Sequence, residues 1–235
     1  MSQLDTAAQY LAAVMDSADN MWTAWFKQVG LQEPMIFYRI VRPGSTYISK
    51  CADAYGRSTV VNTDSPNAFF CPADVVSKNG RTYNGTIVLP LNTFLKMWDG
   101  NIFDKQSKRP GDFAAATIVA HEFGHHIANA LQMQGAFRIP TTPPNAELEA
   151  DCFSGVWART VYKEGLLEPG DVEEAINALS VIGDLNVNAP DHHGTSKQRV
   201  SAWQIGYYGS KANPVPAAPG NCMVAFGGNV PVYTR

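Results

Sequence analysis

Residues 120–126 read Ala-His-Glu-Phe-Gly-His-His, and this stretch contains an H-E-x-x-H pattern. On a helix, His121 and His125 lie on one face a turn apart, so both imidazoles can reach a single metal ion. Glu122 projects beside that face, where it can act on a metal-bound water without being a ligand. His126 points about 100° away from His125 and is expected either to pack in the core or to support the metal ligands from behind. The alternative is a pair of surface histidines next to a carboxylate.

The helix around this motif begins at Asp112, which is a good N-cap, and alanines carry the pattern to about Leu131. A catalytic zinc ion has three protein ligands, so two histidines leave one ligand missing. The extended form of the motif would supply a histidine at position 131 after a glycine at position 128. The sequence has Ala128 and Leu131 there, so the third ligand must come from elsewhere.

The best donors lie on the next predicted helix, over about residues 145–163. Glu147 and Asp151 are four residues apart and share a face, whereas Glu149 lies about 200° around the helix from Glu147. A metal-binding carboxylate and a second carboxylate that accepts a hydrogen bond from a ligating histidine would suit this pairing, which places Asp151 behind the metal ligands. The alternative is an ordinary acidic first turn, which the helix dipole favours.

A second histidine cluster follows at residues 191–199, which read Asp-His-His-Gly-Thr-Ser-Lys-Gln-Arg. The pattern predicts a loop that enters a short helix near Thr195 or Ser196, and loops of this kind often carry functional side chains. A histidine here can stabilise an oxyanion or transfer a proton. It can equally be an ordinary surface histidine, and the pattern alone leaves both readings open.

The remaining sequence predicts an α+β fold. Apolar residues at three- and four-residue steps predict a helix over the first thirty residues, with Ser2 and Asp5 at its start. The apolar run 35–41 is typical of a buried strand, and residues 86–91 form a second strand that Pro90 places at a sheet edge or a strand end.

Loops and a further helix complete the expected architecture. Residues 42–80 are expected to be rich in loops, a helix is expected over about 171–183, and the last thirty residues are expected to wrap the surface as a loop-rich tail. We find no repeat or linker, so residues 1–235 are expected to form a single helix-rich domain with a small sheet.

The composition excludes several classes of protein. The chain has 235 residues, of which 45% are hydrophobic and 17% charged, which suffices for one substantial core. A net charge of -3 without a Lys/Arg cluster argues against a nucleic-acid partner. The longest uncharged apolar runs are shorter than the roughly 18 residues that a membrane span needs. We therefore expect a soluble globular domain.

Four cysteines, Cys51, Cys71, Cys152 and Cys222, are too far apart for a CxxC motif. They are either four small buried thiols or two disulfides, and disulfides would place the chain outside the cytosol. Spacing alone cannot decide the pairing, because four cysteines allow three connectivities.

Together these features resemble the bacterial neutral zinc metallopeptidase family, within the zincin group whose third ligand is a glutamate. The similarity runs in order over about residues 50–210. The matching stretches are 69–74 (Phe-Phe-Cys-Pro-Ala-Asp), 111–114 (Gly-Asp-Phe-Ala), 118–126, 147–158 and 193–199.

The resemblance implies a zincin-like metalloprotease fold and one Zn²⁺ per chain. It assigns the metal ligands to His121, His125 and Glu147, and the catalytic carboxylate to Glu122. It also favours His193 over His192 as the functional histidine of the second cluster.

The resemblance implies an extracytoplasmic domain that follows an N-terminal membrane anchor. Residues 1–5 show neither an anchor nor a signal peptide, which by itself indicates either a cytoplasmic protein or a trimmed chain. On the resemblance and the cysteines we expect a secreted, periplasmic or formerly anchored protein. Composition and resemblance together predict two disulfides, Cys51–Cys71 and Cys152–Cys222. The first would close a loop-rich segment, and the second would join the tail to the helix that carries Glu147.

We therefore predict a zinc-dependent endopeptidase that acts on peptide or protein substrates, with the substrate extended along an edge strand at residues 86–89. Two alternatives stay open. One is a non-catalytic zinc-bearing binding module, against which the intact Glu122 argues. The other is a zinc hydrolase of non-peptide amides, which four free thiols would favour.

Overall fold

The computed structural model describes residues 2–52, 56–102, 105–106, 111–137, 140, 142–183 and 193–227. Within these ranges the protein has the expected α+β fold, with long helices and small sheets. The helices are α1 (Gln3–Gln28), α2 (Leu91–Trp98), α3 (Asp112–Met133), α4 (Pro143–Lys163), α5 (Asp171–Ile182), α6 (Ser196–Tyr208) and α7 (Pro219–Phe226).

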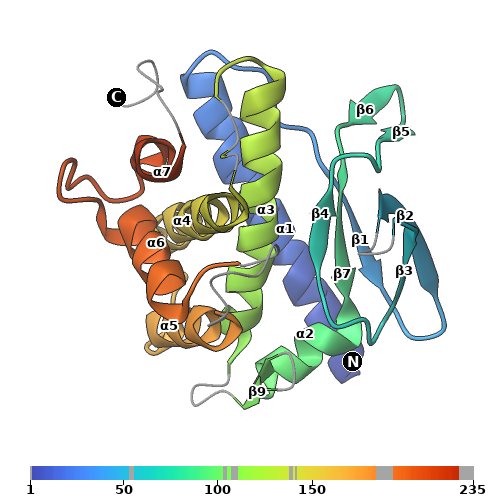
Figure 1. Cartoon of the computed structure of the whole chain (residues 1–235). Helices are drawn as coiled ribbons and strands as arrows, with labels where there is room; N and C mark the ends of the chain where they lie inside the picture. The colour runs from blue at the N-terminus through green and yellow to red at the C-terminus, as the bar shows by residue number, and fades with distance from the viewer. Residues whose placement is uncertain are drawn as a thin grey trace.

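Helix α3 runs through the middle of the molecule, with α4 to α7 on one side and strands β1 to β7 on the other (Figure 1). It is buried along most of its length, and its small alanines let neighbouring helices approach. Gly124 lies close to α4, because a Cβ at this position would lie 2.7 Å from the carbonyl oxygen of Ala150 on that helix. The two helices that carry the predicted metal ligands therefore pack backbone to backbone.

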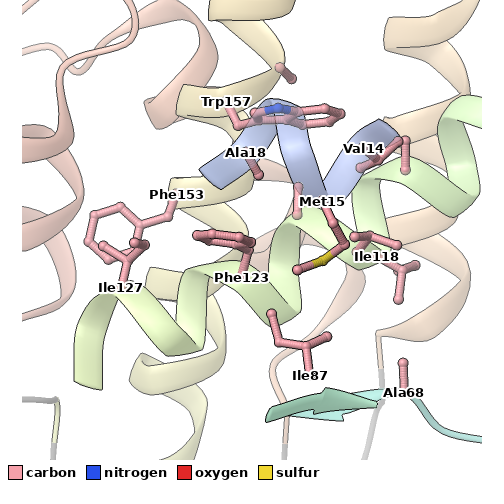
Figure 2. Close-up of a cluster of buried hydrophobic side chains, with 14 of the residues drawn as sticks. Val14, Met15, Ala18, Ala68, Ile87, Ile118, Phe123, Ile127, Phe153 and Trp157 are labelled. Carbon is pink, nitrogen blue, oxygen red and sulfur yellow. The ribbon is translucent and has the colours of Figure 1, made fainter. Parts of the chain in front are cut away.

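The main apolar core lies between α1, α3, α4 and the sheet. Figure 2 shows side chains from these elements meeting around Met15, Phe123 and Ile87. The ring of Trp22 on α1 packs edge-on against Phe153 on α4, with ring centres 5.3 Å apart. Burying such large apolar side chains stabilises the packing of α3 by about 1.5–3 kcal/mol for each side chain.

A three-stranded sheet has the order β1 (Phe37–Val41), β7 (Thr86–Pro90), β4 (Phe69–Cys71). Strand β7 runs parallel to β1 and antiparallel to β4, and all five of its residues are buried. The expectation that residues 86–89 form an edge strand is therefore wrong. Pro90 is the last residue of β7, where a missing N–H is tolerated, and the edge strand on the other side is β4.

Residues 42–80 contain more strand than expected. Strands β2 (Thr46–Ala52) and β3 (Ser58–Asn62) form an antiparallel ribbon, and β5 (Val76–Lys78) pairs with β6 (Arg81–Tyr83). These strands are short and largely exposed, so they lack the apolar run by which a buried strand is found in a sequence. The remaining pair is β8 (Asn101–Ile102) with β9 (Lys105–Gln106).

The C-terminal part is also more ordered than a surface tail. Helix α7 starts at Pro219 and buries Cys222 and Met223 against the core, so the expectation of a loop-rich tail is wrong for this segment. The two predicted disulfides are confirmed, joining Cys51 to Cys71 and Cys152 to Cys222. None of the described helices combines the length and the apolar character that crossing a bilayer would require.

Candidate metal centre

Three side chains from α3 and α4 bring one donor atom each to a common point. The Nε2 atoms of His121 and His125 lie 3.2 Å apart. Oε2 of Glu147 lies 3.3 Å from Nε2 of His121, and Oε1 of Glu147 lies 3.3 Å from Nε2 of His125. A tetrahedral zinc ion with bonds of 2.0–2.1 Å needs ligand atoms about 3.3 Å apart. The three residues that the sequence predicts as ligands therefore lie together with a spacing that suits this ion.

Asp151 lies directly behind this group. Its Oδ1 is 2.8 Å from Nδ1 of His121, and the carboxylate is completely buried. The ring of His121 therefore donates its Nδ1–H to Asp151, which leaves the lone pair of Nε2 facing the other two donors. This is the supporting contact that the spacing of Glu147 and Asp151 predicts.

Arg199 of α6 holds the other side of Asp151. Its Nε lies 2.8 Å from Oδ2 and its Nη2 lies 2.9 Å from Oδ1, which is a two-pronged ion pair. Burial raises the pKa of Asp151, but the charges of Arg199 and His121 outweigh burial and hold this pKa below its usual value. Asp151 is therefore an anion inside the protein.

The field at the centre favours a cation. Burial lowers the pKa of His121, but Asp151 and Glu147 outweigh it and raise the pKa to about 10. Burial likewise raises the pKa of Glu147, and His125 and His121 more than offset this effect, so the pKa lies well below its usual value. The negative charge that favours a proton on His121 equally favours a metal ion at the same place.

Glu122 lies next to the three donors but is not one of them. Its Oε2 accepts a hydrogen bond from the backbone N–H of Phe70 on the edge strand β4, at 3.0 Å. Burial raises the pKa of Glu122 above its usual value, although His121 and His125 act in the opposite direction. A raised pKa brings a carboxylate closer to the range in which it can both accept and return a proton near neutral pH.

Two neighbouring side chains have no place in this group. His126 is fully buried between the rings of Phe70 and Phe123, and its Nε2 lies 2.7 Å from the carbonyl oxygen of Pro34. Burial lowers its pKa to about 4, so it is a neutral packing residue, as its angle on the helix predicts. Glu149 is fully buried away from the three donors, and neither of its carboxylate oxygens has a hydrogen-bond partner among the described residues.

A cleft of about 980 Å³ opens onto the three donors and Glu122. The opposite wall comes from the β2–β3 ribbon and from the segment that leads into β4. The lining residues outside the metal group are Cys51, Ala52, Thr59, Val60, Val61, Ser65, Pro66, Asn67, Ala68, Phe69, Phe70, Pro72, Ile118, Asn129, Ile182, His193 and Arg199. Apart from the histidines, Arg199 is the one basic residue in the described lining of the cleft, and Glu122 and Glu147 are its acidic residues.

His193 is exposed and lines this cleft just before α6. The following turn is fixed by a capping box, in which Thr195 and Gln198 exchange hydrogen bonds. Asp191 and His192 lie outside the described residues, so the preference for His193 over His192 stays a prediction.

Two features of the site are absent from the sequence predictions. Arg199 contacts Asp151 and lies 3.3 Å from His121, 78 positions earlier in the chain. The sequence contains a signal for Arg199, because this residue is the last of the stretch 193–199 that resembles the family. The contact from Phe70 to Glu122 uses a backbone N–H, which no side-chain pattern can reveal.

With this geometry established, comparisons with known proteins identify the family of the chain. The model of the family described as "Putative neutral zinc metallopeptidase" matches residues 2–215. The chain belongs to this family.

Its relatives include YpfJ of Escherichia coli K12, which is 30% identical over 226 residues, covering 86% of this chain and 68% of YpfJ. Rv2575 of Mycobacterium tuberculosis H37Rv is 35% identical over 121 residues, which is 41% of each protein. Both are described as uncharacterized proteins. No solved structure matches the chain.

Proposed function

We propose that the protein is a zinc-dependent endopeptidase. The observation that carries this proposal is the convergence of His121, His125 and Glu147 at separations of 3.2–3.3 Å, with Glu122 beside them in an open cleft. One Zn²⁺ bound there would polarise the substrate carbonyl and lower the pKa of its bound water to about 7.

Glu122 is proposed to move the proton. It accepts a proton from the attacking water as the water oxygen adds to the carbonyl carbon, and it returns the proton to the leaving nitrogen as the C–N bond breaks. The hydrogen bond from Phe70 holds Oε2, which leaves Oε1 for this transfer. His193, at the mouth of the cleft, is proposed to donate a hydrogen bond to the developing oxyanion.

The lining of the cleft supports cleavage inside a chain rather than at its ends. A chain terminus carries a charge, and a site that selects it needs an opposite charge free to pair with it. Apart from the histidines, the one basic residue in the described lining is Arg199, which is engaged by Asp151, and the acidic lining residues are Glu147 and Glu122. The remaining described wall is apolar or neutral, which suits an uncharged stretch of peptide.

We place the extended substrate along β4. This strand pairs with β7 on one side and is the edge of the sheet on the other, and open edges accept an added peptide strand. The Phe70 N–H that points away from β7 already contacts Glu122. A peptide joined to this edge would therefore run past the catalytic carboxylate.

Two broader assignments accompany this proposal. The disulfides support an extracytoplasmic location, because disulfides persist in oxidising compartments. We also propose that the chain acts as one metallopeptidase domain, since a single core cluster joins residues of α1 to α7.

The test is a mixed peptide library incubated with the protein, with and without a chelator, and analysed by mass spectrometry. We expect cleavage at internal bonds that the chelator abolishes and Zn²⁺ restores. Zinc binding without any hydrolysis would favour the binding module instead. Hydrolysis of small amides without cleavage of any peptide would favour the non-peptide hydrolase.

A further inference from the structure

Arg199 forms the outer part of a buried chain of contacts that ends at the metal donors. We propose that Arg199 is a positioning residue that sets the affinity of the centre for its metal by acting through Asp151 on His121. This inference rests on the proposed zinc site and concerns how firmly that site is held.

The two contacts between Arg199 and Asp151 fix the orientation of the carboxylate. The guanidinium of Arg199 binds Oδ2 at 2.8 Å and Oδ1 at 2.9 Å, and this paired contact keeps the carboxylate in the plane of the guanidinium. In that orientation Oδ1 lies 2.8 Å from Nδ1 of His121, so the imidazole ring is held as well. Without Arg199, Asp151 could rotate and the Nε2 of His121 would lose its fixed direction.

The same side chain also supports the loop that carries His193. Gly194 has a φ of +97°, and a Cβ at this position would lie 3.4 Å from Cγ of Arg199 and 3.2 Å from Cδ2 of Leu148. The backbone next to His193 therefore rests on the aliphatic part of Arg199. Loss of this side chain should loosen the mouth of the cleft and the metal site together.

A purely structural role makes a different prediction. A buried ion pair is often neutral for stability when both partners are replaced by uncharged groups, and it is destabilising when one partner is removed. A residue that acts only on stability would change the unfolding midpoint and leave the metal affinity of the folded protein unchanged. Metal affinity is therefore the measurement that separates the two roles.

The experiment is a double-mutant cycle on the metal-free protein, with Arg199→Met, Asp151→Asn and the double variant. Zinc dissociation constants are measured by competition with a chromophoric chelator, and the visible spectrum of the cobalt-loaded protein reports ligand geometry. We expect Arg199→Met to weaken zinc binding about tenfold, and the double variant to bind no more weakly than Asp151→Asn alone. Arg199→Lys should fall between Arg199→Met and the wild type.

Arg159 of α4 provides the matched control. Its guanidinium stacks on the rings of Tyr162 and Tyr207 rather than on the metal group, so Arg159→Met should bind zinc as the wild type does. A folded Arg199→Met protein with wild-type affinity would overturn the proposal, and additive effects in the cycle would exclude the route through Asp151. If Arg199→Met does not fold, Arg199→Lys and the double variant, which buries no unpaired charge, still decide the question. A wild type that binds no zinc would instead refute the proposed function.

Discussion

The backbone nitrogen of Phe70 lies 3.0 Å from Oε2 of Glu122, so the edge strand β4 and helix α3 meet at the carboxylate that we propose as the catalytic base. The residues that follow Phe70 join β4 and the segment after it to strand β2. Cys71 is bonded to Cys51 of β2, and Asp74 accepts hydrogen bonds from the Ser49 hydroxyl and the Lys50 N–H. The stretch 69–74 thus joins helix α3 to the β2–β3 ribbon on the far wall of the cleft.

Replacing Glu122 by Gln should separate metal binding from catalysis. The variant keeps the shape of the side chain but cannot accept a proton, so we expect zinc content to stay at one ion per chain and turnover to fall by about 10²–10⁴-fold. Metal analysis and an internally quenched peptide assay measure the two quantities. Turnover near the wild-type level would rule out Glu122 as the base.

The carboxylates at positions 147 and 149 should differ in their effect on the metal. Glu147→Ala removes both carboxylate oxygens, of which one lies 3.3 Å from Nε2 of His121 and the other 3.3 Å from Nε2 of His125, so zinc occupancy should fall sharply. Glu149→Gln should leave occupancy unchanged, because Glu149 is not in the donor group. Equal loss from both variants would show that the ligand is misassigned.

Glu149 should instead make stability depend on pH. Burial raises its pKa from 4.5 to about 9, so above pH 4.5 the unfolded chain loses this proton while the folded protein keeps it. Stability therefore falls as the pH rises toward 9, and by pH 7 the loss is about 3 kcal/mol at about 1.4 kcal/mol per pH unit.

Urea unfolding of the metal-free protein between pH 5 and pH 8 tests this slope. Glu149→Gln should remove the contribution of this carboxyl group to the slope, whereas Glu164→Gln, at the exposed C-cap of the same helix, should keep the wild-type slope. Parallel slopes for the wild type and Glu149→Gln would mean that Glu149 is already ionised in the folded protein.

Replacing His193 by Ala should reduce turnover without releasing zinc, because His193 lines the cleft but is not one of the donors. The loss should appear in kcat more than in KM if the imidazole contacts only the oxyanion. His192→Ala is the control and should have a milder effect. A larger loss in the His192 variant would shift the assignment by one residue.

Removing the disulfide between Cys51 and Cys71 should damage the cleft more than the metal site. The bond closes a segment of 20 residues and ties the β2–β3 ribbon to β4, and in the chain-entropy model it contributes about 3 kcal/mol. In the double serine variant we expect a lower kcat/KM with unchanged zinc affinity. Thiol titration of the unfolded, unreduced wild type should detect almost no free thiol, and four thiols would contradict the pairing.

The parts of the site that follow local periodicity could be predicted from the sequence. His121 with His125, and Glu147 with Asp151, are spaced by one helical turn, so a single helix places each pair on one face. Contacts between distant segments could not be predicted in this way. The sequence predicts an edge strand at residues 86–89 because Pro90 has no backbone N–H to donate. Nothing in the sequence reveals that β4 pairs with this strand opposite Ile87.

The contact at Gly124 also bears on which ion the centre can accept. At Gly124 a hydrogen atom takes the place of a Cβ that would lie 2.7 Å from the Ala150 carbonyl oxygen. Backbone atoms therefore set the separation of α3 and α4, and rotation of side chains cannot change this separation. Ca²⁺, with bonds of about 2.3–2.6 Å, needs its ligands farther apart than Zn²⁺ does. A methyl group at position 124 would force the helices apart and move Glu147 away from the histidines. The spacing of the three donors is therefore set by the contact between two helix backbones as well as by the donor side chains themselves.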